Sequence, residues 1–137
     1  MTVLPDVESL LVQWLAERHP NLTVVTDLDG LFTDATVPKV VQVNALPAQA
    51  APPAWNGPTL RYEQDLDVDF YAASRVDALD LAVLVTSTAI ELRNQLGQFG
   101  HVSQVIAPPA TRRPDFNQYV RRYGAVWSLT TRPVRTT

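Results

Sequence analysis

The sequence predicts an α+β fold, in which a mostly antiparallel sheet of four to five strands carries two helices on one face. Two observations predict it. Apolar residues recur at helical spacing in two separate segments, and runs of strand length surround them, three of these runs lying between the helices. The resulting order, α-β-β-β-α-β-β, lacks regular strand–helix alternation, so a sheet with segregated helices is favoured. The 137 residues suffice for a single domain, residues 1–137.

The first helix is expected near the N-terminus. Pro5 and Asp6 precede it, and Pro20 ends it. Its inward face repeats at spacings of three and four, through Val7, Leu10, Leu11, Trp14 and Leu15.

Two β-branched segments then predict strands, "LTVVTD" at 22–27 and "KVVQVN" at 39–44. Residues 45–58 hold four prolines and a glycine, which exclude a continuous helix or a central strand. We expect a long exposed loop there, with Trp55 either contacting a partner or folded back onto its own domain.

The third strand, within 59–73, alternates strictly. One face carries Leu66, Val68 and Phe70, and the other carries Asp65, Asp67 and Asp69. Carboxylates in such a row lie roughly 6–7 Å apart, too far for one cation to bind all three. A solvated sheet face is therefore favoured over a metal site, and pairing with arginines of a neighbour is the second alternative.

Ser74 is the expected N-cap of the second helix, with Asp77 three residues on. Gly97 and Gly100 are expected to end it, and its inner stripe is predicted to be Leu79, Ala82, Val83, Ala89, Ile90 and Leu96. The rest is expected to form a strand at 101–107, a proline-rich loop at 108–118, a closing strand at 119–132 and a mobile tail after 133.

Composition excludes several classes of function. Cysteine is absent, which removes disulfides, thiol catalysis and cysteine-bound metals. No apolar stretch approaches the roughly 20 residues that span a bilayer, and no basic region precedes the first apolar residues, so we expect neither a membrane span nor a secretory signal.

Charge is divided along the chain. Residues 1–100 carry 13 acidic and five basic side chains, for −8, whereas residues 101–137 carry one acidic and six basic, for +5. The arginines are spread over a loop, a strand and a tail with little lysine, so direct nucleic-acid recognition is disfavoured. Opposite charge on two parts of one subunit suits head-to-tail contact between copies.

The stretch "DLDGLFTD" matches the first motif of phosphatases of the haloacid dehalogenase superfamily, with Asp27 as nucleophile and Asp29 as general acid. Strand–helix alternation does not follow it, and Lys39 is the only lysine after it. Asp and Gly also recur in ordinary turns. His19 and His101 come without triad spacing. We therefore expect no enzyme, no cofactor and no metal, and keep the phosphatase as the less favoured alternative.

The segments "LPDVESLLVQWLAERHP", "VVTDL", "VVQV", "DVDFYAASRVDALDLA" and "RPDFNQYVRRYGAVWSLTTR" resemble, in this order, tail terminator proteins of long-tailed (siphovirus-type) bacteriophages, especially those of actinobacteria. The resemblance runs over nearly the whole chain. It implies a small sheet flanked by helices and a structural protein of the virion.

The resemblance further implies a ring of six copies at the head-proximal end of the tail. Its partners would be further copies of the chain, the major tail tube protein and the head–tail connector protein, with DNA only in passage through the lumen. Interface or lumen candidates are Asp65, Asp67, Asp69, Arg121, Arg122, Arg112, Arg113 and Trp55. The alternative within the virion is another small head–tail connector or head-completion component.

Overall fold

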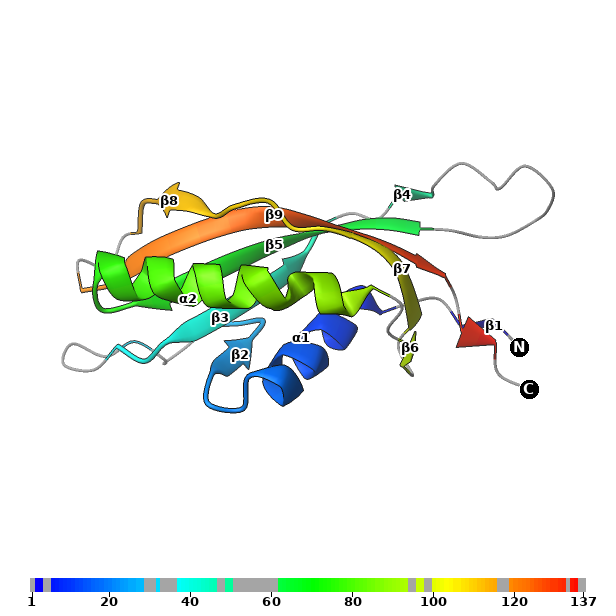
Figure 1. Ribbon diagram of the computed structural model, residues 1–137, viewed down its shortest axis with the longest axis horizontal. Helices are drawn as coiled ribbons and strands as arrows, with labels where there is room; N and C mark the ends of the chain where they lie inside the picture. Colours follow the sequence, from blue (N-terminus) through cyan, green and yellow to red (C-terminus); the bar gives the residue numbers. More distant parts are fainter. Residues whose placement is uncertain are drawn as a thin grey trace.

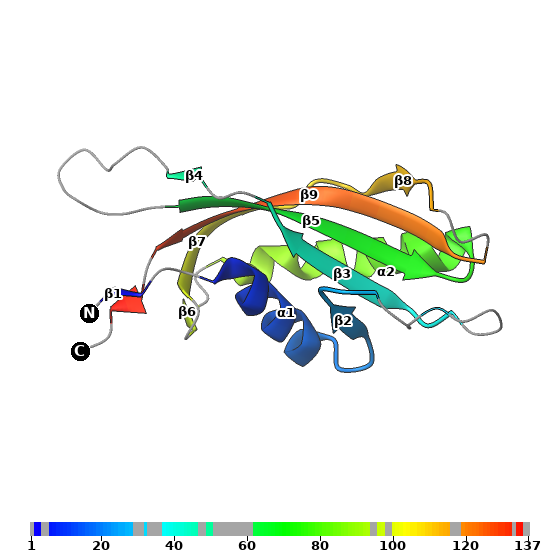
Figure 2. The ribbon, with the colours of Figure 1, turned by 180° about the vertical axis from the view of Figure 1, so that it is seen from behind.

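The α+β prediction is confirmed. A computed structural model describes residues 2–3, 6–28, 32, 37–46, 49–50, 62–93, 96–97, 100–115, 119–132 and 134–135. In this part of the chain a twisted, mostly antiparallel sheet carries two helices on the same face (Figures 1 and 2).

The sheet is built around two long central strands that pair antiparallel from end to end, β5 (Tyr62–Ala72) and β9 (Arg121–Arg132). Its main path is β2-β3-β5-β9-β7-β6, and only the β2–β3 pair is parallel. The remaining strands of this path are β2 (Thr23–Val25), β3 (Val40–Ala45), β7 (Gly100–Ile106) and β6 (Leu96–Gly97).

Two short strands pair with the central pair in addition to the six of the main path, which already exceed the four to five expected. β4 (Gln49–Ala50) pairs with β5, and β8 (Thr111–Arg113) pairs with β9. Because β7 and β8 both pair with β9, they follow one edge of that strand, joined by residues 107–110.

The helices begin where their caps predict. Asp6 accepts a hydrogen bond from the backbone N–H of Ser9 at the start of α1 (Val7–Arg18), and Ser74 accepts one from Asp77 at the start of α2 (Arg75–Thr88). A 3₁₀ turn, η1 (Ala89–Leu92), continues α2. Helix α1 packs against β2 and β3, and α2 packs against β5 and β9.

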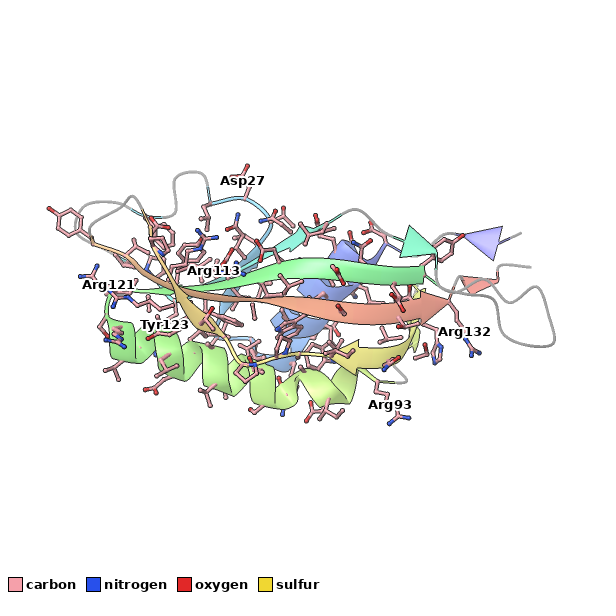
Figure 3. The ribbon with its side chains drawn as sticks, turned by 90° about the horizontal axis from the view of Figure 1, so that it is seen from above. Asp27, Arg93, Arg113, Arg121, Tyr123 and Arg132 are labelled. Atoms are coloured by element: carbon pink, nitrogen blue, oxygen red, sulfur yellow. The ribbon has the colours of Figure 1, made fainter. Side chains whose placement is uncertain are left out.

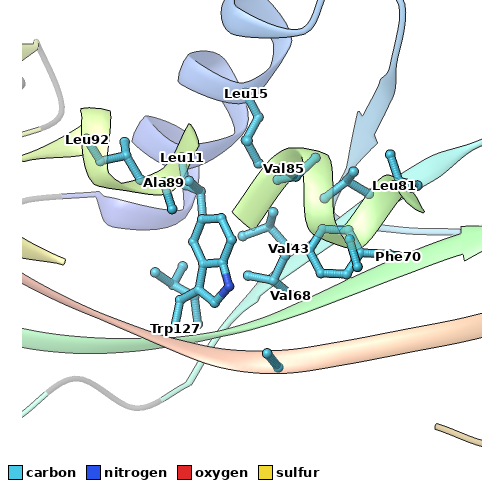
Figure 4. Packing of buried hydrophobic residues seen from close by; sticks show 14 of the residues in the cluster. Leu11, Leu15, Val43, Val68, Phe70, Leu81, Val85, Ala89, Leu92 and Trp127 are labelled. Carbon is cyan, nitrogen blue, oxygen red and sulfur yellow. The ribbon is translucent and has the colours of Figure 1, made fainter. Parts of the chain in front are cut away.

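The core lies between the helices and the sheet (Figure 4). Trp127 of β9 is fully buried among Leu11 of α1 and the Ala89–Leu92 turn, and Phe70 of β5 lies beside Leu81 of α2. Every second residue of β5 and β9 therefore faces the helices, as strand alternation requires.

The predicted inner stripe of the second helix is largely wrong. Ala82 and Ala89 are buried, but Leu79, Val83 and Ile90 are exposed, and the buried side is formed by Ala78, Leu81, Ala82, Val85 and Thr88. The helix also ends at Thr88 rather than at the glycines, because Leu96–Gly97 forms a hairpin with β7.

Two loop predictions also need correction. The expected loop at 108–118 contains β8, and Val134–Arg135, expected to be mobile, forms β10 and pairs with β1 (Thr2–Val3). Of the expected loop at 45–58, Ala45 ends β3 and Gln49–Ala50 forms β4, while residues 51–58 lie outside the described part.

Candidate functional site

The face of the sheet opposite the helices, called the open face below, carries the aspartates that the sequence singles out. Figure 3 looks down on this face, with α1 behind the central strands and α2 along the lower side of the view. Asp65, Asp67 and Asp69 of β5 stand on it opposite Ser128, Val126 and Gly124 of β9.

Asp69 is the centre of an ion-pair cluster and is only 1% exposed. Arg122 of β9 donates to both of its carboxylate oxygens, from Nε to Oδ1 at 3.0 Å and from Nη2 to Oδ2 at 2.8 Å. Arg113 of β8 donates from Nη1 to Asp69 Oδ1 at 2.9 Å and to Asp67 Oδ1 at 2.7 Å. Two charge-assisted partners therefore compensate the burial of this carboxylate.

The prediction that the aspartate row lies on a solvated face is therefore wrong at Asp69. The two arginines come from the same chain rather than from a neighbour, and each is about one quarter exposed. Asp65 remains exposed and accepts a hydrogen bond from the Ser128 hydroxyl at 2.5 Å. Asp67 is intermediate, so exposed acidity on the open face decreases along β5 from Asp65 to Asp69.

Gly124 provides the space that this cluster needs. A Cβ atom at this position would overlap Asp69 Oδ1 and would lie 2.7 Å from both Cδ and Cζ of Arg113. Any larger residue would block the path by which Arg113 crosses β9 to reach β5. The glycine thus serves close packing rather than a turn.

Tyr71 extends the cluster toward β3. Its hydroxyl donates to Gln42 Oε1 at 3.0 Å, its ring lies 5.7 Å from Arg122 Cζ, and the ring of Phe32 packs on it at 5.3 Å. Burial, reinforced by the negative charge of Asp69, raises the pKa of Tyr71 to about 12. With Val40 and Val120, Tyr71 forms a small apolar cluster separate from the main core.

The other candidate arginines gather where α2 begins. Arg112, Arg121 and Arg75 line a cavity of about 230 Å³ together with Tyr123, whose hydroxyl accepts a hydrogen bond from Arg75 Nε at 3.1 Å. Arg113 and Arg122 line this cavity as well. Positive charge is therefore concentrated at this corner of the molecule, where β8 and β9 meet α2 (Figure 3).

An apolar groove of about 310 Å³ lies next to this basic corner along the same helix. Leu79 and Val83 of α2 form one side, and Ala107, Pro109 and Ala110 of the β7–β8 connection form the other. With Val76 of α2 and Ile90 of the η1 turn, these helix residues make an apolar stripe in which each residue is 41–66% exposed. The helix is thus apolar both toward the core and toward solvent, whereas an ordinary surface helix is polar outside.

The two histidines take structural positions. His19 caps the C-terminal end of α1 and is buried, with Nε2 3.0 Å from the Thr88 hydroxyl. That hydroxyl donates to the carbonyl of Val85, so Nε2 of His19 donates to it. Burial lowers the pKa of His19, and the positive charge of Arg18 adds to this. His101 lies in β7.

Two sequence predictions fall largely outside the described residues. Trp55 lies outside the described part of the chain, and so do Asp29 and Gly30 of the phosphatase-like motif. Asp27 is described and is exposed. Among the residues that the structure describes, no group of three or more His, Cys, Asp or Glu side chains is arranged to hold a metal ion.

Sequence reasoning named Asp69, Arg113 and Arg122 as interface candidates, but it missed Gly124, Tyr71 and the pairing of these charges within one chain. Gly124 and Tyr71 show no pattern of their own, and Arg113 lies 44 positions from Asp69 in the sequence. The available signal was the register of the closing strand, because a glycine opposite an aspartate marks a place where another side chain approaches closely.

No protein-family model and no curated protein sequence matches the chain. Within the described residues, no helix has the length and apolar character needed to cross a membrane.

Proposed function

We propose that the protein is a tail terminator: a structural virion protein whose copies form a ring at the head-proximal end of a bacteriophage tail tube. The observation that carries this proposal is that α2 exposes an apolar stripe beside a groove. Solvent-exposed apolar surface of this extent is characteristic of interaction sites. A protein that assembles accounts for it better than one that acts alone.

The resemblance of the sequence to tail terminator proteins indicates which assembly to propose. Its segments run in order through α1, β2, β3, β5, α2 and β9, so they include both helices and the two central strands of the sheet. In the ring, six copies would stop polymerisation of the tube protein and offer a surface to the head–tail connector. DNA would pass through the lumen without sequence-specific contact.

Separated charge supports a ring. The exposed Asp65 and the basic corner around Arg112 lie on different parts of one subunit. Contacts between unlike surfaces are heterologous, and such contacts close into rings when the rotation per copy permits.

The test is the tail-length distribution, by electron microscopy, in a phage lysate where this gene carries a stop codon. The proposal expects overlong tubes of irregular length that are not attached to filled heads, and normal tails when the protein is supplied from a plasmid. Tubes of normal length that fail to join heads would contradict it and indicate a connector or head-completion component instead.

A further inference from the structure

We propose that α2 of one copy docks on the open face of the sheet of a second copy, with the basic corner beside α2 meeting the exposed acidic end of that sheet. The inference deepens the proposed function and rests on it for closure into a ring. The docking itself is a property of the protein alone.

The donor surface is the outer side of α2. Val76, Leu79 and Val83 of α2 are spaced by three and four residues, so they form one stripe roughly 150° from the buried side, and Ile90 of the following η1 turn is exposed as well. The groove beside Leu79 and Val83 continues this apolar surface onto the β7–β8 connection. A side of a helix with this composition is typical of a buried layer.

The acceptor surface is the part of the open face around Asp65 and Val126, since Asp69 and Tyr71 at the other end of this face are buried within the chain. Val126 of β9 is exposed there, directly across from Asp67 of β5 and two register pairs from Asp65. An antiparallel sheet facing water usually presents polar residues outward, and an exposed valine beside acidic side chains departs from that pattern. This face therefore offers an apolar contact with an acidic margin.

The charges of the two surfaces are complementary. Arg75 and Arg112 stand at the start of the donor stripe, and Asp65 lies on the acceptor. Arginine pairs with carboxylates through two parallel hydrogen bonds, so these charges would orient the helix on the sheet.

The two surfaces belong to opposite sides of one sheet. Helix α2 covers the inner face of its own sheet, and the open face lies on the other side (Figures 1 and 3). Each copy can therefore donate its helix to the next copy while accepting the helix of the previous one. Stacking of this kind is heterologous and continues from copy to copy.

The occupant is a second copy rather than DNA. The apolar groove has no counterpart in a phosphate backbone, and the net charge of −3 opposes a long polyanion. A phosphate would also not explain the exposed Val126 on the opposite side of the sheet.

The test measures self-association of the purified full chain by sedimentation across a concentration series. We expect Val83→Asn to weaken association about tenfold, the effect of one buried apolar side chain. The matched control is Leu84→Asn, on the same helix and 50% exposed but outside the stripe, which should leave association unchanged. Equal effects of the two substitutions would overturn the proposal.

A charge exchange tests the acceptor. Arg112→Glu and Asp65→Arg should each weaken association, whereas a mixture of the two variants should recover it, because every contact then joins opposite charges. A mixture without recovery would overturn the proposal. So would a wild-type chain that remains a single copy up to about 1 mM, or one that binds a DNA duplex through Arg112 while remaining a single copy.

This outcome is separable from that of the proposed function. If self-association changes with the substitutions as predicted but loss of the gene leaves tail length normal, the docking is supported and the proposal of a tail terminator is contradicted. Overlong tails together with a chain that never self-associates would do the reverse.

Discussion

Asp69 shows how a charge on a β-strand can be buried at small net cost. Its carboxylate has exchanged water for two guanidinium groups, both of which still reach solvent. Such a pair contributes little net stability compared with apolar packing. It is nevertheless costly to break, because removal of one partner leaves the other charge buried without a partner of opposite sign. Its effect is therefore chiefly on the alignment of β5, β8 and β9.

Substitution of Asp69 by Asn is expected to reduce the free energy of unfolding by about 2–3 kcal/mol, below the range for fully buried pairs because both arginines are partly exposed. Urea denaturation measures it. Asp65→Asn is the matched control, on the same strand and face but exposed, and should change stability by less than about 0.5 kcal/mol. Equal losses in the two variants would refute the buried-cluster interpretation.

Gly124→Ala is expected to destabilise the protein by about 1–3 kcal/mol, because the added methyl group overlaps Asp69 and Arg113 and displaces the guanidinium. The same substitution made in an Arg113→Ala background should cost less, since part of the clash has been removed. A thermodynamic cycle from urea denaturation measures the difference. Full additivity of the two changes would contradict the proposed steric role.

His19 predicts a pH dependence of stability. Its pKa is lowered in the folded protein by burial and by Arg18, with Glu91 opposing, so the unfolded chain binds the proton more readily. Stability should therefore be fully present above the unfolded pKa of about 6.5 and should decrease as pH falls below it. Denaturation midpoints between pH 7.5 and 5 measure this effect, and His19→Gln should flatten that part of the profile. An unchanged slope in the variant would assign it to other groups.

At the scale of elements, α2 combines a precise start with an ambiguous orientation. Ser74 defines where the helix begins, since its side-chain oxygen accepts the N–H of Asp77 at 3.1 Å. Its side chains do not define which side is buried, because Leu and Val occur on both. Contact with β5 and β9 selects the side with the small residues Ala78 and Ala82, which allow the helix to approach the sheet closely.

Ser74→Ala is expected to reduce stability by about 1 kcal/mol through loss of the N-cap. Ser87→Ala is a control in the same helix: the Ser87 hydroxyl donates only to the Leu84 carbonyl within the helix and is exposed. Alanine is a better helix former at such a position, so this variant should be neutral or slightly more stable. Thermal or urea unfolding distinguishes them, and a smaller loss at Ser74 than at Ser87 would contradict the cap assignment.

At the scale of the whole molecule, the sheet has one face occupied by its two helices and one that these helices leave uncovered, where Asp65 is exposed and Asp69 is buried. The acidic and basic regions that the sequence separates into residues 1–100 and 101–137 are only partly separate in space, since Arg113 and Arg122 neutralise Asp67 and Asp69 within one chain. Among the described residues, Asp65 stays exposed on one side of the sheet, and Arg112 stays exposed at the basic corner.

Self-association through these surfaces should weaken with salt. Raising NaCl from about 0.05 to 0.5 M shortens the screening length from about 14 Å to about 4 Å, so the charged margin loses most of its attraction. The apolar stripe keeps its contribution to binding at high salt. We therefore expect the affinity between copies to fall about tenfold rather than to be abolished. Sedimentation equilibrium at both salt concentrations measures it. Association that strengthens at high salt would show that charge complementarity contributes nothing.

The sequence by itself determined the fold class, the start of both helices and the alternation of apolar and acidic residues along β5. These features depend on signals within a few residues: the period of two in a strand, the N-cap side chain, and proline as a terminator. They hold whatever the rest of the chain does. The resemblance to tail terminators also came from sequence and stays a proposal.

Tertiary structure decided the rest. The aspartate row looked uniform in sequence, yet Asp69 is buried and Asp65 is not, because Arg113 reaches β5 only across Gly124, through a pairing of β8 with β9. The buried side of α2 was decided in the same way, by the shape of the sheet beneath it. Partners distant in sequence determine which side chain loses its water, and a local pattern contains no information about those partners.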